Sequence, residues 1–373
     1  MSDLQRQVQE AIDRLVQSGT ERGLQVAVYQ DGKQVVDAVA GLADPEEAGR
    51  PVTPHTPFFS FSIGKGVAAT VVHVLAERGL FTYDTRIVEL WPEFGAHGKE
   101  KTTIRHALSQ SAGVPGLPSG LAVEDMCDWD KMCAIIADSE PWWEPGTKIG
   151  YHAVTWGYIV GEIVRRATGK PISQVLREEV AEPLGVGGEL FFAVPESELS
   201  RLARLENAPS DPSAEAAAFE LPPDSPMLKV GPPEATTAEY GNRRDVLTSN
   251  IPAGGTVTAR AVARMYAALL GEVDGVRLIS PERLREVSAV AMSGIDQVFG
   301  FPTSWGLGYS IGRFMSDAHE TQHVFGVGGV GGSHAFADTA TGISFALTKN
   351  RIAPSFETAE TVAGVVTRAL ANR

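Results

Sequence analysis

The sequence is poor in cysteine and has no long apolar run. Its only cysteines, Cys127 and Cys133, lie six residues apart on a predicted helix and therefore on different faces. This spacing argues against a disulfide or a cysteine metal site and favours two inert core thiols. The longest apolar runs fall far short of the roughly 20 residues that cross a bilayer. Because Met1–Val8 indicates an amphipathic helix rather than an export signal, we expect a cytoplasmic protein with no membrane partner.

Positive charge is also scarce. The sequence has 32 Lys and Arg against 46 Asp and Glu, a formal net charge of −14. This balance argues against nucleic acid and anionic membrane surfaces as partners. The 373 residues are enough to bury a large core in one two-lobed unit or two domains. We expect a small-molecule partner, and the sequence leaves the oligomeric state open.

Strand patterns lie at both ends of the chain, and helical patterns lie between them. Residues 24–41 alternate around Asp31-Gly32, the signal of a β-hairpin. Residues 102 to about 187 have a helical pattern. Further alternation is found in 306–311, 323–326, 334–337 and 343–348, and further helices are predicted over 67–78, 258–270 and 357–371.

We therefore predict an α/β (α+β) fold. An antiparallel sheet is built from the N- and C-terminal segments and flanked by helices, and a largely helical lobe is inserted. Residues 1–95 and 255–373 form the predicted sheet lobe, and residues 96–254 form the helical lobe. The helical lobe includes a long surface excursion near 207–240, rich in Pro, Ala and Glu. Excursions of this length are usually functional or mobile.

Two short motifs match cofactor signatures but lie in the wrong context. His319–His323 has the zincin spacing, which works only on a helix, whereas here it lies between strand-like runs. Gly326–Gly331 matches a dinucleotide fingerprint, but it precedes a predicted strand rather than a helix. A Gly-x-Ser-x-Gly elbow is absent, which argues against an α/β-hydrolase. We expect neither a metal nor an organic cofactor.

Ser62–Lys65 places a hydroxyl and an amine one helical turn apart, directly after an apolar run. A serine needs an adjacent base to act as a nucleophile, and a desolvated lysine can be that base. Taken alone, the tetrad favours an N-cap serine followed by a solvated lysine.

Two later segments offer chemistry that complements this tetrad. Tyr151 lies in Gly150–Ala153 at a predicted loop-to-helix junction. A nearby ammonium group lowers the pKa of a phenol, so its phenolate form can act as a base. Phe325–Ser333 reads as a glycine-rich strand. Where side chains are absent, the backbone can approach a substrate and its N–H groups can stabilise an oxyanion.

The order of these three elements resembles the serine β-lactamase and penicillin-binding-protein superfamily, in particular its class C-like branch, which includes the family VIII carboxylesterases. The resemblance covers nearly the whole chain. Its further matching segments are Leu90–Phe94, Thr103–Ser109, Ala112-Gly113, Tyr151–Gly157, Pro183–Gly185, Gly328–Ser333 and Phe336–Asp338.

The resemblance implies that Ser62 is the acylated nucleophile, Lys65 its partner amine and Tyr151 a second base. It also implies an oxyanion site made by the backbone N–H groups of Ser62 and Val330. Gly328 and Gly329 would lie beside this site and bind substrate.

Two positions depart from the lactamase pattern. Ala153 stands where lactamases carry an asparagine, and Val327 stands where their third motif begins with a lysine. Both replacements remove polar groups that would contact a β-lactam, so a neutral ester is favoured over an anionic lactam.

We predict a serine hydrolase that cleaves small carboxylic esters through an acyl-Ser62 intermediate. An acyltransferase that delivers the acyl group to an amine or alcohol is the main alternative. An apolar pocket lined by Trp142, Trp143, Trp156 and Trp305 would favour such transfer, although core packing explains most of these tryptophans equally well. A β-lactamase or peptidase activity and a non-catalytic binding protein are the remaining alternatives.

Overall fold

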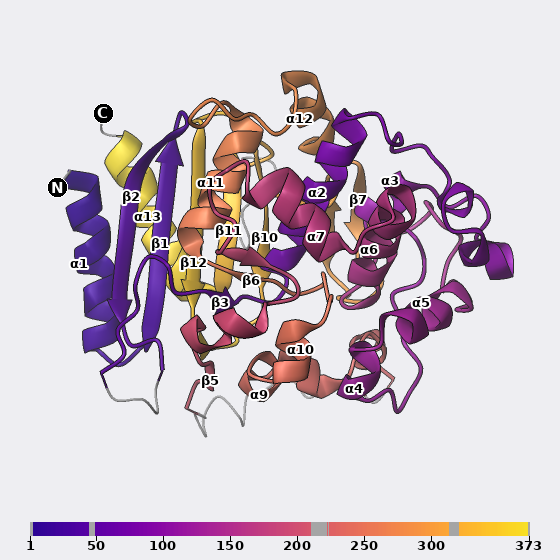
Figure 1. The fold of residues 1–373 in the computed structure, drawn as a ribbon, viewed down its shortest axis with the longest axis horizontal. Helices are drawn as coiled ribbons and strands as arrows, with labels where there is room; N and C mark the ends of the chain where they lie inside the picture. Colours follow the sequence, from indigo (N-terminus) through magenta and orange to yellow (C-terminus); the bar gives the residue numbers. More distant parts are fainter. Residues whose placement is uncertain (1–2, 45–48, 210–221, 223, 313–320, 372–373) are drawn as a thin grey trace.

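The computed structural model describes residues 3–44, 49–209, 222, 224–312 and 321–371. Within these residues eight strands form one sheet in the order β2-β1-β12-β11-β10-β9-β8-β7, and all neighbouring strands are antiparallel (Figure 1). The sheet is therefore built from both ends of the chain, as predicted. Its strands are β1 (Gly23–Gln30), β2 (Lys33–Gly41), β7 (Met292–Ile295), β8 (Pro302–Trp305), β9 (Ser310–Ile311), β10 (Val324–Gly329), β11 (Ser333–Asp338) and β12 (Ile343–Lys349).

The sheet is covered on both faces. Along β1, Val26 and Val28 pack with α1 (Asp3–Gln17) and α13 (Glu357–Ala371), which lie together at the left of Figure 1. Ala27 and Tyr29 belong to the core on the opposite face, where α11 (Ala259–Leu270) and α2 (Ile63–Glu77) pack. Successive strand residues point to opposite faces, so one strand supplies both cores.

Short helices form the rest of the structure and lie mainly to the right of the sheet in Figure 1. The central one is α6 (Thr155–Thr168), which packs against α2, α3 and α5. The other α-helices are α3 (Ile104–Leu108), α4 (Val123–Met126), α5 (Trp129–Ala137), α7 (Ile172–Leu176), α9 (Ala238–Gly241), α10 (Arg244–Thr248) and α12 (Pro281–Val287). Short 3₁₀ helices span Ile87–Glu89, Pro92–Gly98, Glu196–Arg201, Pro226–Lys229 and Pro233–Thr236, and a π-helical turn spans Arg177–Ala181.

The two cysteines do not share a helix, contrary to our expectation. Cys127 caps the end of α4, whereas Cys133 lies within α5, because Asp128 starts a new helix by accepting the backbone N–H of Lys131. Both thiols are free, and burial raises their pKa values above the ordinary range.

Part of the predicted excursion, residues 210–221 and 223, lies outside the described residues. The lobe boundaries at 1–95, 96–254 and 255–373 stay a prediction. No helix in the part of the chain that the structure describes is both long and apolar enough to cross a membrane, and a cytoplasmic location likewise stays a prediction.

Candidate active site

Ser62 lies at a sharp junction between the short strand β3 (Phe58–Phe59) and helix α2. The turn is made by Phe61, whose φ of 48° lies in the left-handed region that few side chains adopt. Helix α2 begins at Ile63, directly after Ser62, so the tetrad forms the first turn of a helix, as its spacing predicted. Gly64 in this turn packs against the backbone of Gly254, where a Cβ would come within 2.4 Å of a carbonyl carbon.

Lys65 is fully buried beside the serine. Its Nζ lies 3.2 Å from Ser62 Oγ and donates to the carbonyl oxygens of Ala153, at 2.7 Å, and Ala253, at 3.4 Å. Ser62 makes no side-chain capping bond to α2. Ser62 thus occupies the N-cap position without capping the helix, and Lys65 is buried rather than solvated, so the pair has the arrangement that nucleophile activation requires.

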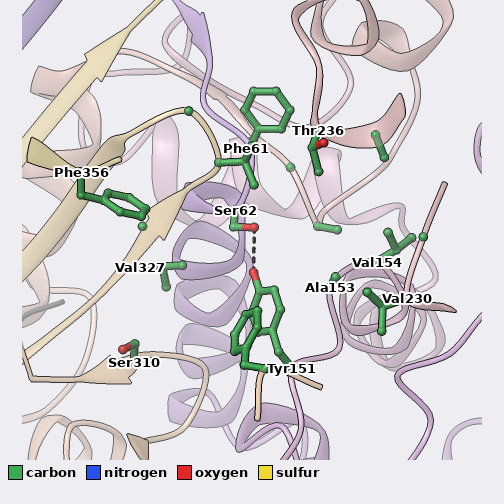
Figure 2. Close-up of a pocket in the computed structure, with 18 of the residues that line it drawn as sticks. Phe61, Ser62, Tyr151, Ala153, Val154, Val230, Thr236, Ser310, Val327 and Phe356 are labelled. Atoms are coloured by element: carbon green, nitrogen blue, oxygen red, sulfur yellow. Dashed lines mark hydrogen bonds between the residues drawn. The ribbon is translucent and has the colours of Figure 1, made fainter. Parts of the chain in front are cut away.

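Tyr151 completes this cluster from a distant part of the chain. Its phenol oxygen lies 2.8 Å from Ser62 Oγ, the contact drawn as a dashed line in Figure 2. The Lys65 Nζ is 4.8 Å from the centroid of the Tyr151 ring, so the ammonium charge faces the phenol. The structure thus brings together the three reactive side chains that the sequence predicted.

The backbone around Tyr151 is held from one side by residues 110–114. Gly150 N–H donates to Gln110 O at 3.0 Å, and His152 N–H donates to Gln110 Oε1 at 2.8 Å. The His152 ring accepts from Val114 N–H through Nε2 and bonds Gly150 O through Nδ1. These bonds require the neutral ring protonated at Nδ1, and burial lowers the pKa of His152 to about 4. His152 is therefore a structural brace.

The predicted glycine-rich strand at 325–333 is instead a hairpin. Strand β10 ends at Gly329, and β11 begins at Ser333 after a turn in which Gly331 and Gly332 have φ values of 89° and 93°. Such values favour glycine, so some of the glycines in this segment are required by the turn rather than by the strand. A Cβ on Gly329 would lie 2.1 Å from Ser60 O, which shows how closely the hairpin approaches the backbone before Ser62.

The remaining predicted site residues lie at this hairpin. Gly328 and Val330 line the cavity beside Ser62, and the Val330 side chain is 39% exposed. Gly329 faces the backbone at Ser60. The N–H of Val330 as an oxyanion donor stays a prediction.

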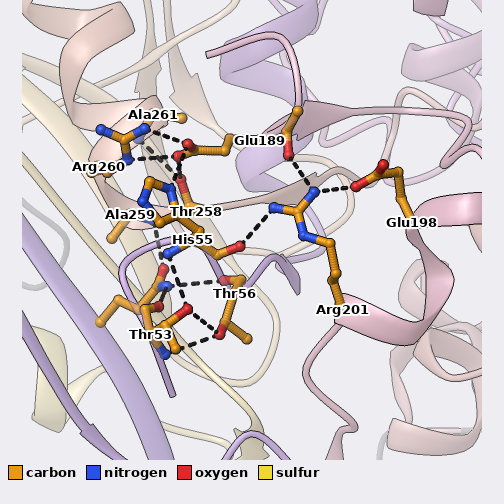
Figure 3. Close-up of polar contacts among 12 residues, drawn as sticks. Thr53, His55, Thr56, Glu189, Glu198, Arg201, Thr258, Ala259, Arg260 and Ala261 are labelled. Atoms are coloured by element: carbon orange, nitrogen blue, oxygen red, sulfur yellow. Dashed lines mark hydrogen bonds and ion pairs between the residues drawn. The ribbon is translucent and has the colours of Figure 1, made fainter. Parts of the chain in front are cut away.

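A buried polar cluster supports the strands that lead to Ser62. Strand β6 (Thr256–Val257) pairs with both β3 and β4 (Leu190–Phe191), while β5 (Glu206–Asn207) pairs separately with β13 (Arg351–Ile352). Next to β4, the Glu189 carboxylate accepts from Thr258 at 2.7 Å and from Arg260 at 2.8 Å, and it contacts the His55 ring at 3.0 Å (Figure 3). Burial alone would raise the pKa of Glu189, but these partners bring it below its usual range. The cluster therefore links the start of α11 to the segments just before β3 and β4, the two strands that pair with β6.

A cavity of about 900 Å³ opens over Ser62 and Tyr151. Residues of the 207–240 excursion form part of its wall, among them Met227, Val230 and Thr236. Among the described lining residues none is Lys, Arg, Asp or Glu. Besides Tyr151, the aromatic residues in the wall are Phe59, Phe61, Tyr240, Phe299, Phe301, Trp305, His334, Phe336 and Phe356.

The structure decides between the cavity and the core for the four tryptophans. Only Trp305 of the four lines the cavity. Trp143 and Trp156 are buried in the core, and Trp142 is exposed elsewhere. The apolar character of an aromatic residue does not predict whether it packs in the core or lines the cavity.

Only part of the zincin-like motif lies within the described residues. His319 and Glu320 fall outside the described residues, and His323 directly precedes β10. Gly326–Gly331 lies in β10 and its turn and leads into a strand. Within the described ranges no group of three or more His, Cys, Asp and Glu side chains is placed to hold a metal ion.

Comparisons with known proteins agree with this fold and site. The Beta-lactamase family model matches residues 8–366. The chain is 36% identical to the esterase/beta-lactamase LipL of Mycobacterium tuberculosis, over 88% of this chain and 76% of that protein. It is 27% identical to the esterase EstB of Burkholderia gladioli, over 88% of this chain and 86% of that protein. The crystal structure of a family VIII carboxylesterase superposes with a TM-score of 0.86 at 31% identity, covering 98% of both chains.

The fold and the relatives define a serine ester hydrolase with a β-lactamase-like fold. The chain belongs to the Beta-lactamase family. The predicted family and fold are thereby confirmed, and the predicted enzyme class, a serine ester hydrolase, agrees with these relatives.

Proposed function

We propose that this protein hydrolyses small, neutral carboxylic esters through an acyl-enzyme at Ser62. The main support for the proposal is that a phenol and an amine both lie within hydrogen-bonding distance of the Ser62 hydroxyl oxygen. Ser62 Oγ lies 2.8 Å from the Tyr151 phenol and 3.2 Å from the Lys65 amine. Relatives named as esterases support the same chemistry.

In the acylation step, Ser62 Oγ attacks the ester carbonyl while its proton passes to the phenolate of Tyr151. The tetrahedral intermediate collapses, the carbon–oxygen bond to the alcohol breaks, and Tyr151 returns the proton to the leaving alkoxide. The ammonium of Lys65 stabilises the phenolate before each transfer. The products of this half-reaction are the free alcohol and the acyl-serine ester.

Deacylation runs through the same groups with water in place of the alcohol. Tyr151 takes a proton from water, the hydroxide attacks the acyl carbon, and Ser62 leaves with the proton that Tyr151 returns. In both half-reactions the backbone N–H groups of Ser62 and Val330 stabilise the oxyanion. The close approach of Gly329 to Ser60 supports this arrangement.

The cavity favours a neutral substrate with apolar groups on either side of the ester. Its described lining residues include no Lys, Arg, Asp or Glu, and burial of apolar surface then supplies most of the binding free energy. Ala153 contributes a carbonyl to Lys65 but no polar side chain, and Val327 is a buried, apolar wall residue. An anionic β-lactam finds no complementary charge among these residues.

Acyl transfer to an alcohol or amine is the second candidate. The cavity of about 900 Å³ has room for an acceptor beside the acyl group, and its apolar wall disfavours water. The two functions share the acyl-Ser62 intermediate and differ only in the nucleophile that removes the acyl group.

Intact-mass spectrometry after brief incubation with p-nitrophenyl acyl esters tests the proposal. We expect a transient mass increase equal to the acyl group, absent in Ser62→Ala. As the matched control we use Ser288→Ala, whose hydroxyl only donates to Leu284 O at the end of α12. Undiminished turnover by Ser62→Ala would refute the function. Adding alcohols or amines and comparing acylated product with free acid separates transfer from hydrolysis.

A further inference from the structure

Asp296 is a fully buried carboxylate on the loop between β7 and β8, near the proposed active site. Its Oδ1 accepts three backbone N–H groups, those of Val298 at 2.8 Å, Phe299 at 2.9 Å and Tyr151 at 3.2 Å. Two of these bonds shape its own loop, and the third crosses to the segment that carries the phenol. A buried carboxylate that accepts several N–H groups forms strong hydrogen bonds, so the contact between this loop and the Tyr151 backbone is rigid.

A second bond joins the same two segments. Gln297 N–H donates to Ile149 O at 2.9 Å, two residues before Tyr151. The loop itself is closed by Asp296 N–H to Phe301 O at 3.0 Å and by Gly300 N–H to Asp296 O at 2.8 Å. The backbone at 149–151 is therefore braced by this loop, in addition to its bonds with Gln110.

The loop also contacts the Tyr151 ring directly. Phe299 stacks on that ring with centroids 4.9 Å apart and an interplanar angle of 21°. Phe301 continues the stack, 5.2 Å from Phe299. Offset aromatic stacks restrict ring tilt, so the loop constrains the phenol through both backbone and side chain.

We propose that Asp296 is a positioning residue for Tyr151. Its carboxylate fixes the Tyr151 backbone and the Phe299 loop together, and so holds the phenol at its place beside Ser62. Asp296 does not contact Ser62, and it acts only through Tyr151. The inference rests on the proposed function, because it assigns the phenol a role in proton transfer.

The test is a double-mutant cycle measured as kcat with a neutral p-nitrophenyl ester. We expect Asp296→Ala to lower kcat by about 10- to 100-fold, because small displacements of a reacting group are costly. In the Tyr151→Phe background the same change has no further effect, since the group that Asp296 positions is gone. An equal fold-loss in both backgrounds would overturn the proposal.

Two further variants separate geometry from charge and remain informative if Asp296→Ala does not fold. Asp296→Asn keeps an oxygen that can accept the three N–H groups, so we expect kcat within about threefold of the parent. Asp296→Glu keeps the charge but displaces the oxygen, so kcat falls while the thermal midpoint shows a folded protein. An Asn variant as impaired as the Glu variant contradicts the positioning role.

Asp338→Ala is the matched control. Asp338 is also buried and accepts two backbone N–H groups, those of Ala340 and Thr341, but it does not line the cavity. We expect lower thermal stability with unchanged kcat. Full activity of Tyr151→Phe would refute the proposed function itself, whereas an impaired Tyr151→Phe with an unaffected Asp296→Ala would refute only the role of Asp296.

Discussion

The phenol oxygen of Tyr151 lies 2.8 Å from the hydroxyl oxygen of Ser62, although 89 residues separate the two in the sequence. Ser62 begins a helix that packs on the sheet, whereas Tyr151 lies just before α6 in the helical part. The distance between the two oxygens therefore depends on how α6 and α2 pack. It also depends on the braces at Gln110 and Asp296.

Tyr151→Phe removes the phenol hydroxyl and keeps the ring that stacks on Phe299. We expect kcat to fall by about 10²-fold or more, the usual effect of losing a general base. Steady-state kinetics with a p-nitrophenyl ester measures this. Tyr158→Phe is the control, because its hydroxyl only donates to Met126 O in the core. Equal activity of the two variants would exclude Tyr151 from proton transfer.

Lys65→Met replaces the buried amine by an apolar side chain of similar length. The charge beside Ser62 and Tyr151 is lost, so we expect acylation to slow by at least about 10²-fold. Stopped-flow measurement of the p-nitrophenol burst reports this step. Lys99→Met is the matched control, since Lys99 is also buried and donates to three carbonyl oxygens away from the cavity. It should lose stability and keep its burst, and a preserved burst in Lys65→Met contradicts the assignment.

Gly329→Ala tests the approach of the hairpin to the nucleophile. The new Cβ would lie 2.1 Å from Ser60 O, so either the hairpin or the backbone before Ser62 must shift. We expect kcat to fall by about 10-fold or more, since an oxyanion site tolerates little displacement. Gly271→Ala places its Cβ in open space and serves as the control. Comparable kcat values for both variants would show that the hairpin has no part in catalysis.

The free energy of unfolding should decrease as the pH falls below the pKa of an ordinary histidine. Burial lowers the pKa of His152 to about 4 and that of His73 to about 3, from 6.5. Between pH 6.5 and these values the unfolded chain binds protons that the folded protein does not. The free energy of unfolding therefore falls by up to roughly 1.4 kcal/mol per pH unit for each histidine.

Urea unfolding at pH 7.5, 6 and 5 measures this slope. His152→Asn should flatten it by about the contribution of one proton, because the substitution removes one histidine whose pKa is lowered in the folded protein. The effect is absent above about pH 7, where both states have neutral histidines. An unchanged slope in His152→Asn shows that its ring is protonated in the folded protein.

Elements that depend on local pattern were predicted well. The β1–β2 hairpin forms around Asp31-Gly32, both with positive φ, and the last helix spans Glu357–Ala371 as its periodicity indicated. Strands β7 and β8 were missed because their short, Gly-, Ser- and Pro-containing segments lack apolar alternation. They matter to the site, since the loop between them carries Asp296 and Phe299.

The sequence alone determined the spacing of Ser62 and Lys65, because residues three apart on a helix share a face whatever surrounds them. It also determined the family, through motifs in a set order. Only the tertiary structure decided that Lys65 is desolvated, that Tyr151 reaches Ser62, and which aromatic residues line the cavity. These depend on contacts between residues far apart in the chain, and no local periodicity encodes such contacts.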